Sequence, residues 1–356
     1  MKIITLYNHK GGVSKTTTTF NLCSYLSGIG KKVLIVDADP QCNLTEIALA
    51  NTIKRLDEES ARDNTIRELP GTNILDILNQ RIKGDSAFID LDKVEVCNII
   101  ENLDIIRGSV DLSSIEDDFA EAHVQRLSQR TNLMRTYVSI GDFLVRLAEK
   151  NNYDYIFIDV GPSSGALTRA FFLTCDAFFI PVAPDRFNVQ AMSTLSHIIK
   201  RWELEHQQAV NTYKELGMPI RHGNPAFLGC IVQAFKKFAG AAKPGYQLWM
   251  NRIPVEIDSK LKSVIPNEKY LPASDNKSQN DAIVIEIPDF NQLAPLMQEV
   301  GKAVFNIVQA DTALITNSGE PWRGNNWTSA LERITFYKGL FEKASNVIFK
   351  YEAADK

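Results

Sequence analysis

One short segment near the start of the chain constrains its fold more than any other feature. Residues 10–17 read KGGVSKTT and follow an apolar run at residues 2–7. A strand, a glycine-bearing loop and a helix start, in that order, are the layout of a phosphate-binding loop, in which backbone N–H groups at a helix N-terminus face an anion. The strict pattern has glycine where this chain has His9 and Ser14, and a second lysine, Lys10, begins the loop.

The bulk composition limits the class of protein. With 356 residues, of which 44% are hydrophobic and 23% charged, the chain can bury a large globular core. A formal net charge of -4 argues against coating nucleic acid by bulk electrostatics, although a local basic face would suffice for phosphate contacts. The cysteines include no Cys-x-x-Cys pair, which disfavours zinc and iron–sulfur sites. We expect neither a signal peptide nor a membrane span, and therefore a cytoplasmic protein.

Apolar runs alternate with helical segments along most of the chain. Strands are expected at residues 32–37, 103–108, 155–159, 177–182 and 227–233, and helices at residues 15–27, 111–150 with an interruption at Gly141, 188–216 and 292–308. This alternation predicts an α/β fold with a doubly wound, mostly parallel sheet covered by helices on both faces. Such sheets bind ligands at the carboxyl ends of their strands, where Asp37, Asp39 and Asp159 all fall.

Two stretches stand apart from this alternation. Residues 46–72 are polar and charged, which predicts a surface insertion or an exposed helix. Residues 317–326 are linker-like, and apolar side chains recur at helical spacing after them. We therefore expect a nucleotide-binding domain at residues 1–310 and a linker with a C-terminal amphipathic helix at residues 311–356. Mixed charges favour a helix packed on the body or on a dimer partner over one lying on a membrane.

The residues of the loop have separate expected roles. Lys15 should neutralise the β- and γ-phosphates, the Thr16 hydroxyl should bind Mg²⁺, and Thr17 should reach the α-phosphate. The cradle around the β-phosphate should consist of the backbone N–H groups of Gly11, Gly12, Val13, Ser14, Lys15 and Thr16. A glycine turn with incidental lysines is the alternative, and the combination of strand, loop motif and helix argues against it.

Three carboxylates complete the expected site. Asp159 ends an apolar strand, as an acid that holds Mg²⁺ through water would, and a loop with two glycines follows it at residues 161–165. Asp37 and Asp39 flank Ala38 just after the second strand. One of these two acids can hydrogen-bond the phosphate loop and the other can orient an attacking water. We expect Thr16, Asp37 and Asp159 at the Mg²⁺ site, with polar strand ends as the alternative interpretation.

Three segments together resemble a known family. The sequences KGGVSKTT at residues 10–17, VDADPQCN at 36–43 and FIDVGP at 157–162 resemble, in order and spacing, the nucleotide motifs of ParA/MinD-type ATPases with the deviant Walker A loop. The DPQxN run is more similar to the ParA branch than to MinD. Gly161 and Cys42 depart from the family, which usually has proline and glycine at these positions. The similarity covers roughly residues 1–308.

The resemblance implies a slow ATPase with ATP and Mg²⁺ as cofactors, which closes as an ATP-sandwich homodimer. It implies that Lys10 reaches the partner subunit's phosphates, that Asp39 positions the hydrolytic water, and that Asp159 is the Walker B acid. Lys10, Lys15 and Asp39 are thus the expected catalytic residues. Adenine-side contacts are expected at positions similar to those of the family, namely Gln233, Pro288 and Asp289.

Three functions are compatible with these residues. The first is a ParA-type ATPase for DNA partition or cargo positioning, stimulated by a ParB-like protein and associated with the nucleoid through sequence-independent DNA binding. The second is an ATP-dependent switch subunit of a larger mobile-element or defence assembly. The third is a MinD-like membrane positioner, which the tail fits poorly. Candidate DNA phosphate contacts, which could equally be solvated loop residues, are Lys236, Lys237, Lys243, Lys260 and Lys262.

Overall fold

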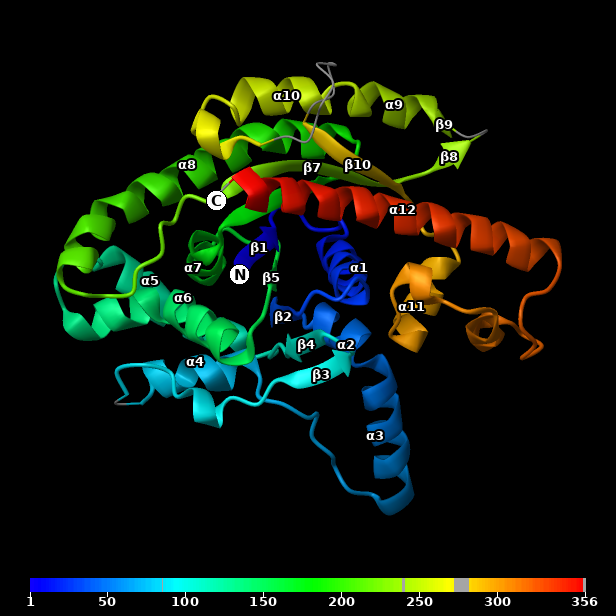
Figure 1. Ribbon diagram of the computed structural model, residues 1–356, viewed down its shortest axis with the longest axis horizontal. Helices are drawn as coiled ribbons and strands as arrows, with labels where there is room; N and C mark the ends of the chain where they lie inside the picture. The colour runs from blue at the N-terminus through cyan, green and yellow to red at the C-terminus, as the bar shows by residue number, and fades with distance from the viewer. Residues whose placement is uncertain (85, 239–240, 272–281, 355–356) are drawn as a thin grey trace.

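The first strand of the chain, β1 (Lys2–Leu6), lies inside an eight-stranded sheet of order β10-β7-β6-β1-β5-β2-β4-β3 in the computed structural model (Figure 1). The structure describes residues 1–84, 86–238, 241–271 and 282–354. The other strands of the sheet are β2 (Val33–Ala38), β3 (Cys97–Ile100), β4 (Leu103–Ile106), β5 (Tyr155–Val160), β6 (Ala177–Val182), β7 (Ala226–Phe235) and β10 (Ile283–Pro288). Every neighbouring pair is parallel except β3 and β4, which confirms the predicted fold class.

Helices connect the strands and cover both faces of the sheet (Figure 1). The α-helices are α1 (Lys15–Gly28), α2 (Asn43–Ala48), α3 (Ala50–Asp63), α4 (Ile74–Ile82), α5 (Glu116–Val124), α6 (Thr131–Asn151), α7 (Ala166–Thr174), α8 (Arg186–Glu215), α9 (Pro244–Met250), α10 (Ile253–Lys260), α11 (Leu293–Val300) and α12 (Asn325–Ala354). Short 3-10 helices occur at η1 (Leu91–Lys93), η2 (Leu112–Ile115), η3 (Asn267–Lys269), η4 (Val304–Asn306) and η5 (Gln309–Ile315). A two-stranded ribbon pairs β8 (Lys237–Phe238) with β9 (Ala241–Ala242).

Two hydrophobic layers enclose the sheet. Successive residues of a strand point to opposite faces, so Ile3 packs in one layer and Ile4 in the other. The first layer includes side chains of α4, α5, α6, α7, α8 and α10, and the second includes side chains of α1, α2, α11 and α12. The central strands β2, β5 and β6 are buried along their whole length, as parallel strands covered on both faces must be.

Two helix predictions were wrong in detail. Gly141 does not interrupt the helix, because α6 runs continuously through it. A Cβ atom at this position would lie 2.7 Å from Cγ of Arg221, so the glycine allows close packing. The helix expected at residues 292–308 ends at Val300, because Gly301 adopts φ 57° and forms a left-handed cap. The short edge strands β3 and β10 were not predicted.

The C-terminal helix α12 packs along the body of the protein, as the sequence predicts. Ile334, Phe341 and Ile348 are 5%, 0% and 0% exposed and belong to the second hydrophobic layer. Near its end, the Tyr351 hydroxyl donates to the Asp176 carbonyl oxygen at 3.1 Å. These apolar side chains of the helix are therefore covered by the protein, whereas Leu331 near its start is 48% exposed. No helix in the described ranges is long and apolar enough to cross a membrane.

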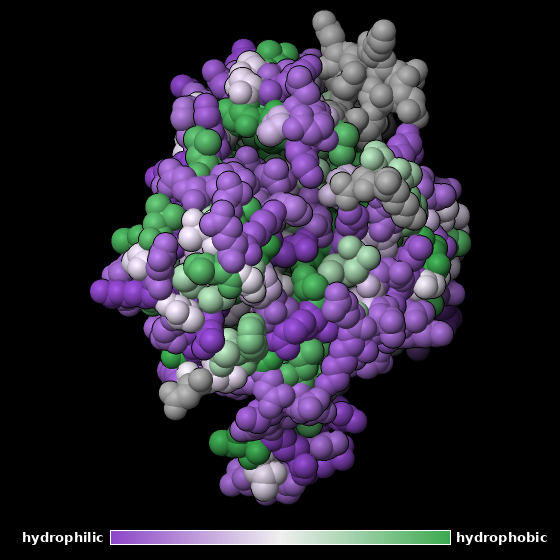
Figure 2. All heavy atoms as spheres, turned by 60° about the vertical axis from the view of Figure 1, so that its left-hand side comes forward, coloured by the Kyte–Doolittle hydropathy of each residue, from purple (hydrophilic) through white to green (hydrophobic). Residues whose placement is uncertain are grey.

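Residues 46–72 form a projection that starts inside the body. The short helix α2 has buried residues, whereas α3 has none and extends away from the sheet (Figure 1). Figure 2 shows that the lower projection is mostly hydrophilic. The expectation of an exposed helix in this polar stretch is thus met by α3.

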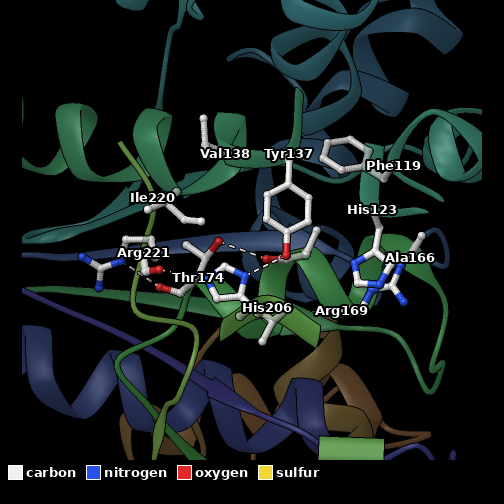
Figure 3. Close-up of a pocket in the computed structure, with 13 residues that line it drawn as sticks. Phe119, His123, Tyr137, Val138, Ala166, Arg169, Thr174, His206, Ile220 and Arg221 are labelled. Carbon is white, nitrogen blue, oxygen red and sulfur yellow. Dashed lines mark hydrogen bonds between the residues drawn. The ribbon is translucent and has the colours of Figure 1, made fainter. Parts of the chain in front are cut away.

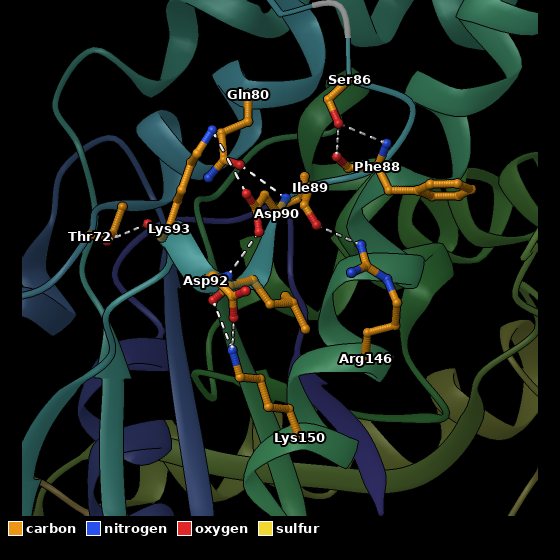
Figure 4. Close-up of polar contacts among 11 residues, drawn as sticks. Thr72, Gln80, Ser86, Phe88, Ile89, Asp90, Asp92, Lys93, Arg146 and Lys150 are labelled. Carbon is orange, nitrogen blue, oxygen red and sulfur yellow. Dashed lines mark hydrogen bonds and ion pairs between the residues drawn. The ribbon is translucent and has the colours of Figure 1, made fainter.

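The long connection between α4 and β3 is fastened to α6 by polar contacts (Figure 4). Lys150 donates to a carboxylate oxygen of Asp92 at 2.7 Å, and Arg146 donates to the carbonyl oxygen of Ile89 at 2.9 Å. These contacts lie on the outer side of α6 and hold the connection without contributing to the phosphate loop.

Candidate functional site

The phosphate loop joins β1 to α1 and contains two residues with left-handed backbone. Gly12 has φ 72° and Ser14 has φ 50°. Glycine adopts this conformation at little cost, whereas a residue with a Cβ atom pays roughly 1–2 kcal/mol for it. The Ser14 side chain makes no capping hydrogen bond to α1 that would offset this cost. The tight turn brings the N-terminus of α1 to the carboxyl end of the sheet.

Lys15 lies folded against the loop. Its ammonium donates to the carbonyl oxygens of Asn8 and Lys10, both at 3.3 Å, and the residue is only 7% exposed. Burial lowers the pKa of Lys15, and the charges of Asp159 and Asp39 act in the opposite direction. The buried cation thus stands between the loop and two carboxylates.

Thr16 and Asp159 form the most direct link between the loop and the sheet. The Thr16 hydroxyl donates to Oδ2 of Asp159 at 2.7 Å, and Asp159 is 1% exposed. Burial, aided by the charge of Asp37, raises the pKa of Asp159 to about 8. Its other oxygen, Oδ1, has no hydrogen-bond partner within the described part of the chain.

These two side chains fit a Mg²⁺ ion. A hydroxyl and an unpaired carboxylate oxygen are hard donors, which this ion prefers, and Mg²⁺ commonly takes its remaining ligands from phosphate and water. No group of three or more His, Cys, Asp or Glu side chains that could hold a metal occurs in the described ranges.

Asp37 is completely buried and is held by α2. Its Oδ2 accepts hydrogen bonds from the backbone N–H of Thr45 at 2.8 Å and from the Thr45 hydroxyl at 2.6 Å. Burial raises the pKa of Asp37 to about 6, and the hydrogen bonds from Thr45 counteract this effect. The Thr45 hydroxyl also accepts from Gly108 N–H at 2.8 Å. The role of Asp37 as a Mg²⁺ ligand stays a prediction, since protein groups occupy its oxygens in this structure.

Asp39 lies at the edge of the loop groove and close to the segment after β5. Its Oδ1 accepts from the backbone N–H of Gln41 at 3.0 Å. A Cβ atom at Gly161 would lie 3.2 Å from both Cγ and Oδ1 of Asp39, which is tighter than an ordinary contact. Glycine at position 161 therefore leaves room for the carboxylate that we expect to position the water.

An open groove of about 1140 Å³ runs beside these residues. The phosphate loop, residues 11–17, forms one wall. Side chains of α3 and α11 form another, including Ile53, Lys54, Asp57, Glu58, Gln298 and Glu299. A nucleotide needs a cleft of several hundred Å³, so the groove is large enough to hold one.

Two residues at this site were missed by the sequence reasoning. Asn8 accepts from the backbone N–H of Lys10 at 3.0 Å and donates to the carbonyl oxygen of Pro181 at 2.8 Å, which fastens the start of the loop to β6. Thr45 holds Asp37 as described above. Asn8 lies two residues before Lys10, just after the first strand, and this position is the one signal in the sequence that pointed to it. Nothing local in the sequence pointed to Thr45.

The three predicted adenine contacts come together at the carboxyl ends of β7 and β10. Gln233 pairs with Ile287 in the parallel register, and Asp289 N–H donates to the Phe235 carbonyl oxygen at 2.9 Å. None of the three lines the groove. Gln233 is 1% exposed, and its amide contacts the loop itself. Their contact with a base remains a prediction.

The candidate DNA contacts lie on the segment that follows β7. Lys236, Lys243 and Lys262 are exposed and Lys260 is half-buried, whereas the side chain of Lys237 lies outside the described residues. The Lys243 N–H donates to the Lys236 carbonyl oxygen at 3.2 Å, which brings these two residues together. Two acidic residues, Glu256 and Asp258, precede Lys260 on α10, so this helix carries charges of both signs.

A second, much smaller cavity lies between α5, α6, α7 and α8 (Figure 3). It has about 30 Å³, room for a water molecule. The Tyr137 hydroxyl and Nδ1 of His206 are hydrogen-bonded at 2.8 Å beside it, and Nε2 of His206 lies 2.9 Å from the carbonyl oxygen of Arg221. These contacts hold α6 to α8 and are separate from the phosphate loop.

Comparison with known proteins agrees with this geometry. The family model AAA_31, described as an AAA domain, matches residues 1–212. The chain is 34% identical over 199 residues to the sporulation initiation inhibitor protein Soj of Bacillus subtilis. The aligned region covers 56% of this chain and 65% of Soj. It is 28% identical over 202 residues to the chromosome partitioning protein ParA of Caulobacter vibrioides, covering 56% and 63%. The matched part thus spans slightly less than two thirds of these relatives.

Solved structures show the same fold. Protein DIP2308 from Corynebacterium diphtheriae has a TM-score of 0.64 and 23% identity, covering 85% of this chain and 97% of that one. A variant of McdA from Cyanothece, solved as an ATP complex, has a TM-score of 0.57 and 18% identity, covering 98% and 96%. At these identities the likeness concerns the fold alone. The chain belongs to the AAA domain family matched at residues 1–212, and with its two-lysine loop it is a P-loop protein of the ParA/MinD type.

Proposed function

We propose that this protein is a ParA-like ATPase in which ATP closes a homodimer and hydrolysis reopens it. The observation that carries the proposal is the hydrogen bond of the Thr16 hydroxyl to the buried Asp159 carboxylate at 2.7 Å, beside Lys15 in the loop. This constellation pairs a cation for phosphate with two oxygen donors for Mg²⁺. The similarity to Soj and to the chromosome partitioning protein ParA supports the assignment to partition or cargo positioning.

The residues of the candidate site have separate roles in this proposal. Lys15 neutralises the phosphates of the nucleotide in its own subunit, and Lys10 reaches those of the partner. Asp39 orients the attacking water from the groove edge. Mg²⁺, when bound with ATP at Thr16 and Asp159, supplies positive charge to the β- and γ-phosphates. Hydrolysis is slow until a ParB-like protein stimulates it, because the switch must persist in its ATP state.

The ATP dimer binds DNA without sequence preference in this proposal, and the protein is then associated with the nucleoid in the cytoplasm. The exposed Lys236, Lys243 and Lys262 are the proposed phosphate contacts. Contacts of this kind carry no sequence information and weaken steeply with salt, because binding releases counterions from the DNA.

Phosphate release and a DNA mobility shift test this function together. Wild-type protein with ATP and Mg²⁺ should hydrolyse ATP slowly and shift plain duplex DNA at low salt. Lys15→Ala should lose both properties, and Lys338→Ala, which alters an exposed lysine of α12, should retain both. Absence of hydrolysis in the wild type would refute the ATPase. Hydrolysis without any ATP-dependent shift at low salt would refute the DNA-binding part.

A second function, a switch subunit of a larger mobile-element or defence assembly, is favoured by α3. This helix has no buried residue, yet Asp57 and Glu58 on it line the groove opposite the phosphate loop. A protein bound there would sense the nucleotide. Copurification from the native cells separates the two functions. A stable partner that no longer copurifies with the double variant Asp57→Arg/Glu58→Arg, while that variant still binds DNA, supports the assembly. A basic ParB-like partner instead supports partition.

A further inference from the structure

Gln233 makes two contacts that join distant parts of the chain at the phosphate loop. Its Oε1 accepts a hydrogen bond from the Thr18 hydroxyl at 2.6 Å, and its Nε2 donates to the carbonyl oxygen of Val13. Gln233 is 1% exposed and Thr18 is 0% exposed. Both polar ends of the amide are therefore used inside the protein, behind the loop and not in the groove.

The two contacts enclose the strained residue of the loop. Val13 directly precedes Ser14, and Thr18 donates its backbone N–H to the Ser14 carbonyl oxygen at 3.0 Å. Ser14 itself has φ 50° and no capping hydrogen bond. A non-glycine residue keeps a left-handed conformation only where the surrounding structure holds it there. The amide of Gln233 connects the residue before this turn to the first turns of α1.

The backbone of β7 is also unusual beside Gln233. Ala234 has φ 62°, so a second non-glycine residue is left-handed at this point. The pairing of β7 with β10 shifts register between Ile287 and Pro288, which pair with Gln233 and Phe235. Such an irregularity turns a side chain away from the regular alternation of a strand. The irregular end of β7 thus places the side-chain amide of Gln233 against the phosphate loop.

We infer that Gln233 is a positioning residue that clamps the phosphate loop in its phosphate-binding conformation, and that it acts on the phosphate chain and not on the base. This inference rests on the proposed function, because it takes the loop to bind the phosphates of a nucleotide. It replaces the expected adenine contact of Gln233 with a contact to the loop. Removing the clamp frees the loop to leave the left-handed turn at Ser14, so every ligand that uses the loop loses affinity by the same factor.

Calorimetric titration of wild type and Gln233→Leu with three ligands tests the clamp. The ligands are ATP, GTP and inorganic tripolyphosphate, each with Mg²⁺. Loss of two buried hydrogen bonds predicts an affinity loss of about tenfold for each ligand. The ATP-to-GTP ratio should stay within about twofold of the wild-type ratio. An unchanged affinity for tripolyphosphate with a loss for ATP alone would overturn the clamp and return Gln233 to the base.

A rescue variant separates positioning from general damage. Gly at position 14 adopts the left-handed turn without a clamp, so Ser14→Gly added to Gln233→Leu should restore most of the lost affinity. No restoration would contradict the inference. Gln207→Leu is the matched control. The side chain of Gln207 also donates to a backbone carbonyl oxygen, that of His222, but Gln207 lies on α8 and makes no hydrogen bond with the phosphate loop in the described part of the chain. Its ligand affinities should equal those of the wild type.

Thermal melting and titration of a second variant distinguish loss of the clamp from loss of the fold and from failure of the proposed function. If thermal melting shows that Gln233→Leu does not fold, Thr18→Val removes the Oε1 contact alone and should lower all three affinities by about threefold. An unchanged affinity of folded Thr18→Val would then overturn the clamp. If wild type binds none of the three ligands, the proposed function itself fails. If wild type binds them and Gln233→Leu binds equally well, only the clamp fails.

Discussion

Asp37 and Asp159 lie directly opposite each other in the parallel register of β2 and β5. Each of these buried acids accepts a hydrogen bond from a threonine hydroxyl, Asp37 from Thr45 on α2 and Asp159 from Thr16 on α1. Burial raises the pKa of both carboxyl groups. The end of the sheet therefore places two acids side by side, one bound by protein groups and the other with an unpaired oxygen beside the phosphate loop.

Thr45→Val should destabilise the protein by about 2 kcal/mol. The change removes the hydroxyl that donates to Asp37 and accepts from Gly108 N–H, and leaves a buried acceptor and a buried donor short of a partner. Urea denaturation followed by circular dichroism measures the difference. Thr335→Val on the exposed side of α12 is the control and should change stability by less than about 0.5 kcal/mol. Equal effects of the two variants would contradict the role of Thr45.

Ser14→Gly should stabilise the protein by about 1 kcal/mol, since glycine adopts φ 50° without a Cβ penalty. The flexibility of glycine in the unfolded chain offsets part of the gain. Ser14→Ala is the matched control, because alanine keeps the Cβ atom and should bring no gain. Denaturant titration of both variants compares them. A gain for Ala equal to that for Gly would show that the loop is not strained at this residue.

Glu203 should make stability depend on pH. Glu203 lies on α8 and is 9% exposed, and burial raises its pKa to about 8. A carboxyl group with a raised pKa in the folded state keeps its proton there while the unfolded chain releases it near its ordinary pKa of 4.5. Its stabilising contribution is therefore complete below about pH 4.5 and is lost as the pH rises to about 8.

Glu203→Gln tests this effect because glutamine stays neutral at every pH. Relative to wild type, the variant should gain stability as the pH rises from 4.5 to 8, by on the order of 5 kcal/mol. Urea denaturation curves measured at several pH values give the free energies of unfolding of both proteins. Parallel pH profiles would show that Glu203 does not carry the dependence.

Lys243→Glu with Lys262→Glu should weaken ATP-dependent DNA binding and flatten its salt dependence. Each lost phosphate contact reduces the slope of log affinity against log salt by about 1. Fluorescence anisotropy with labelled duplex DNA at several salt concentrations measures the slope, and Lys338→Glu serves as the control. ATP hydrolysis in the absence of partner should stay unchanged. A wild-type slope in the double variant would exclude these lysines as contacts.

Local patterns in the sequence were enough to predict the strand, loop and helix of the phosphate cradle, because residues 2–28 form a continuous unit. Local patterns also predicted the positions of Asp37 and Asp159, because the end of an apolar run marks the carboxyl end of a buried strand. Edge strands such as β3 were missed because a four-residue run carries little periodic signal. The partners of Asn8, Thr45 and Gln233 depend on tertiary packing, which no local spacing encodes.

Light scattering of Asp39→Ala after gel filtration tests the central claim, that this loop makes ATP a dimerising ligand. The chain has a mass of 39.9 kDa. With ATP and Mg²⁺, Asp39→Ala should elute with twice this mass, because the bound nucleotide closes the dimer and is not hydrolysed. The same variant with ADP, and Lys15→Ala with ATP, should both elute as monomers. A monomeric Asp39→Ala in saturating ATP would contradict the account.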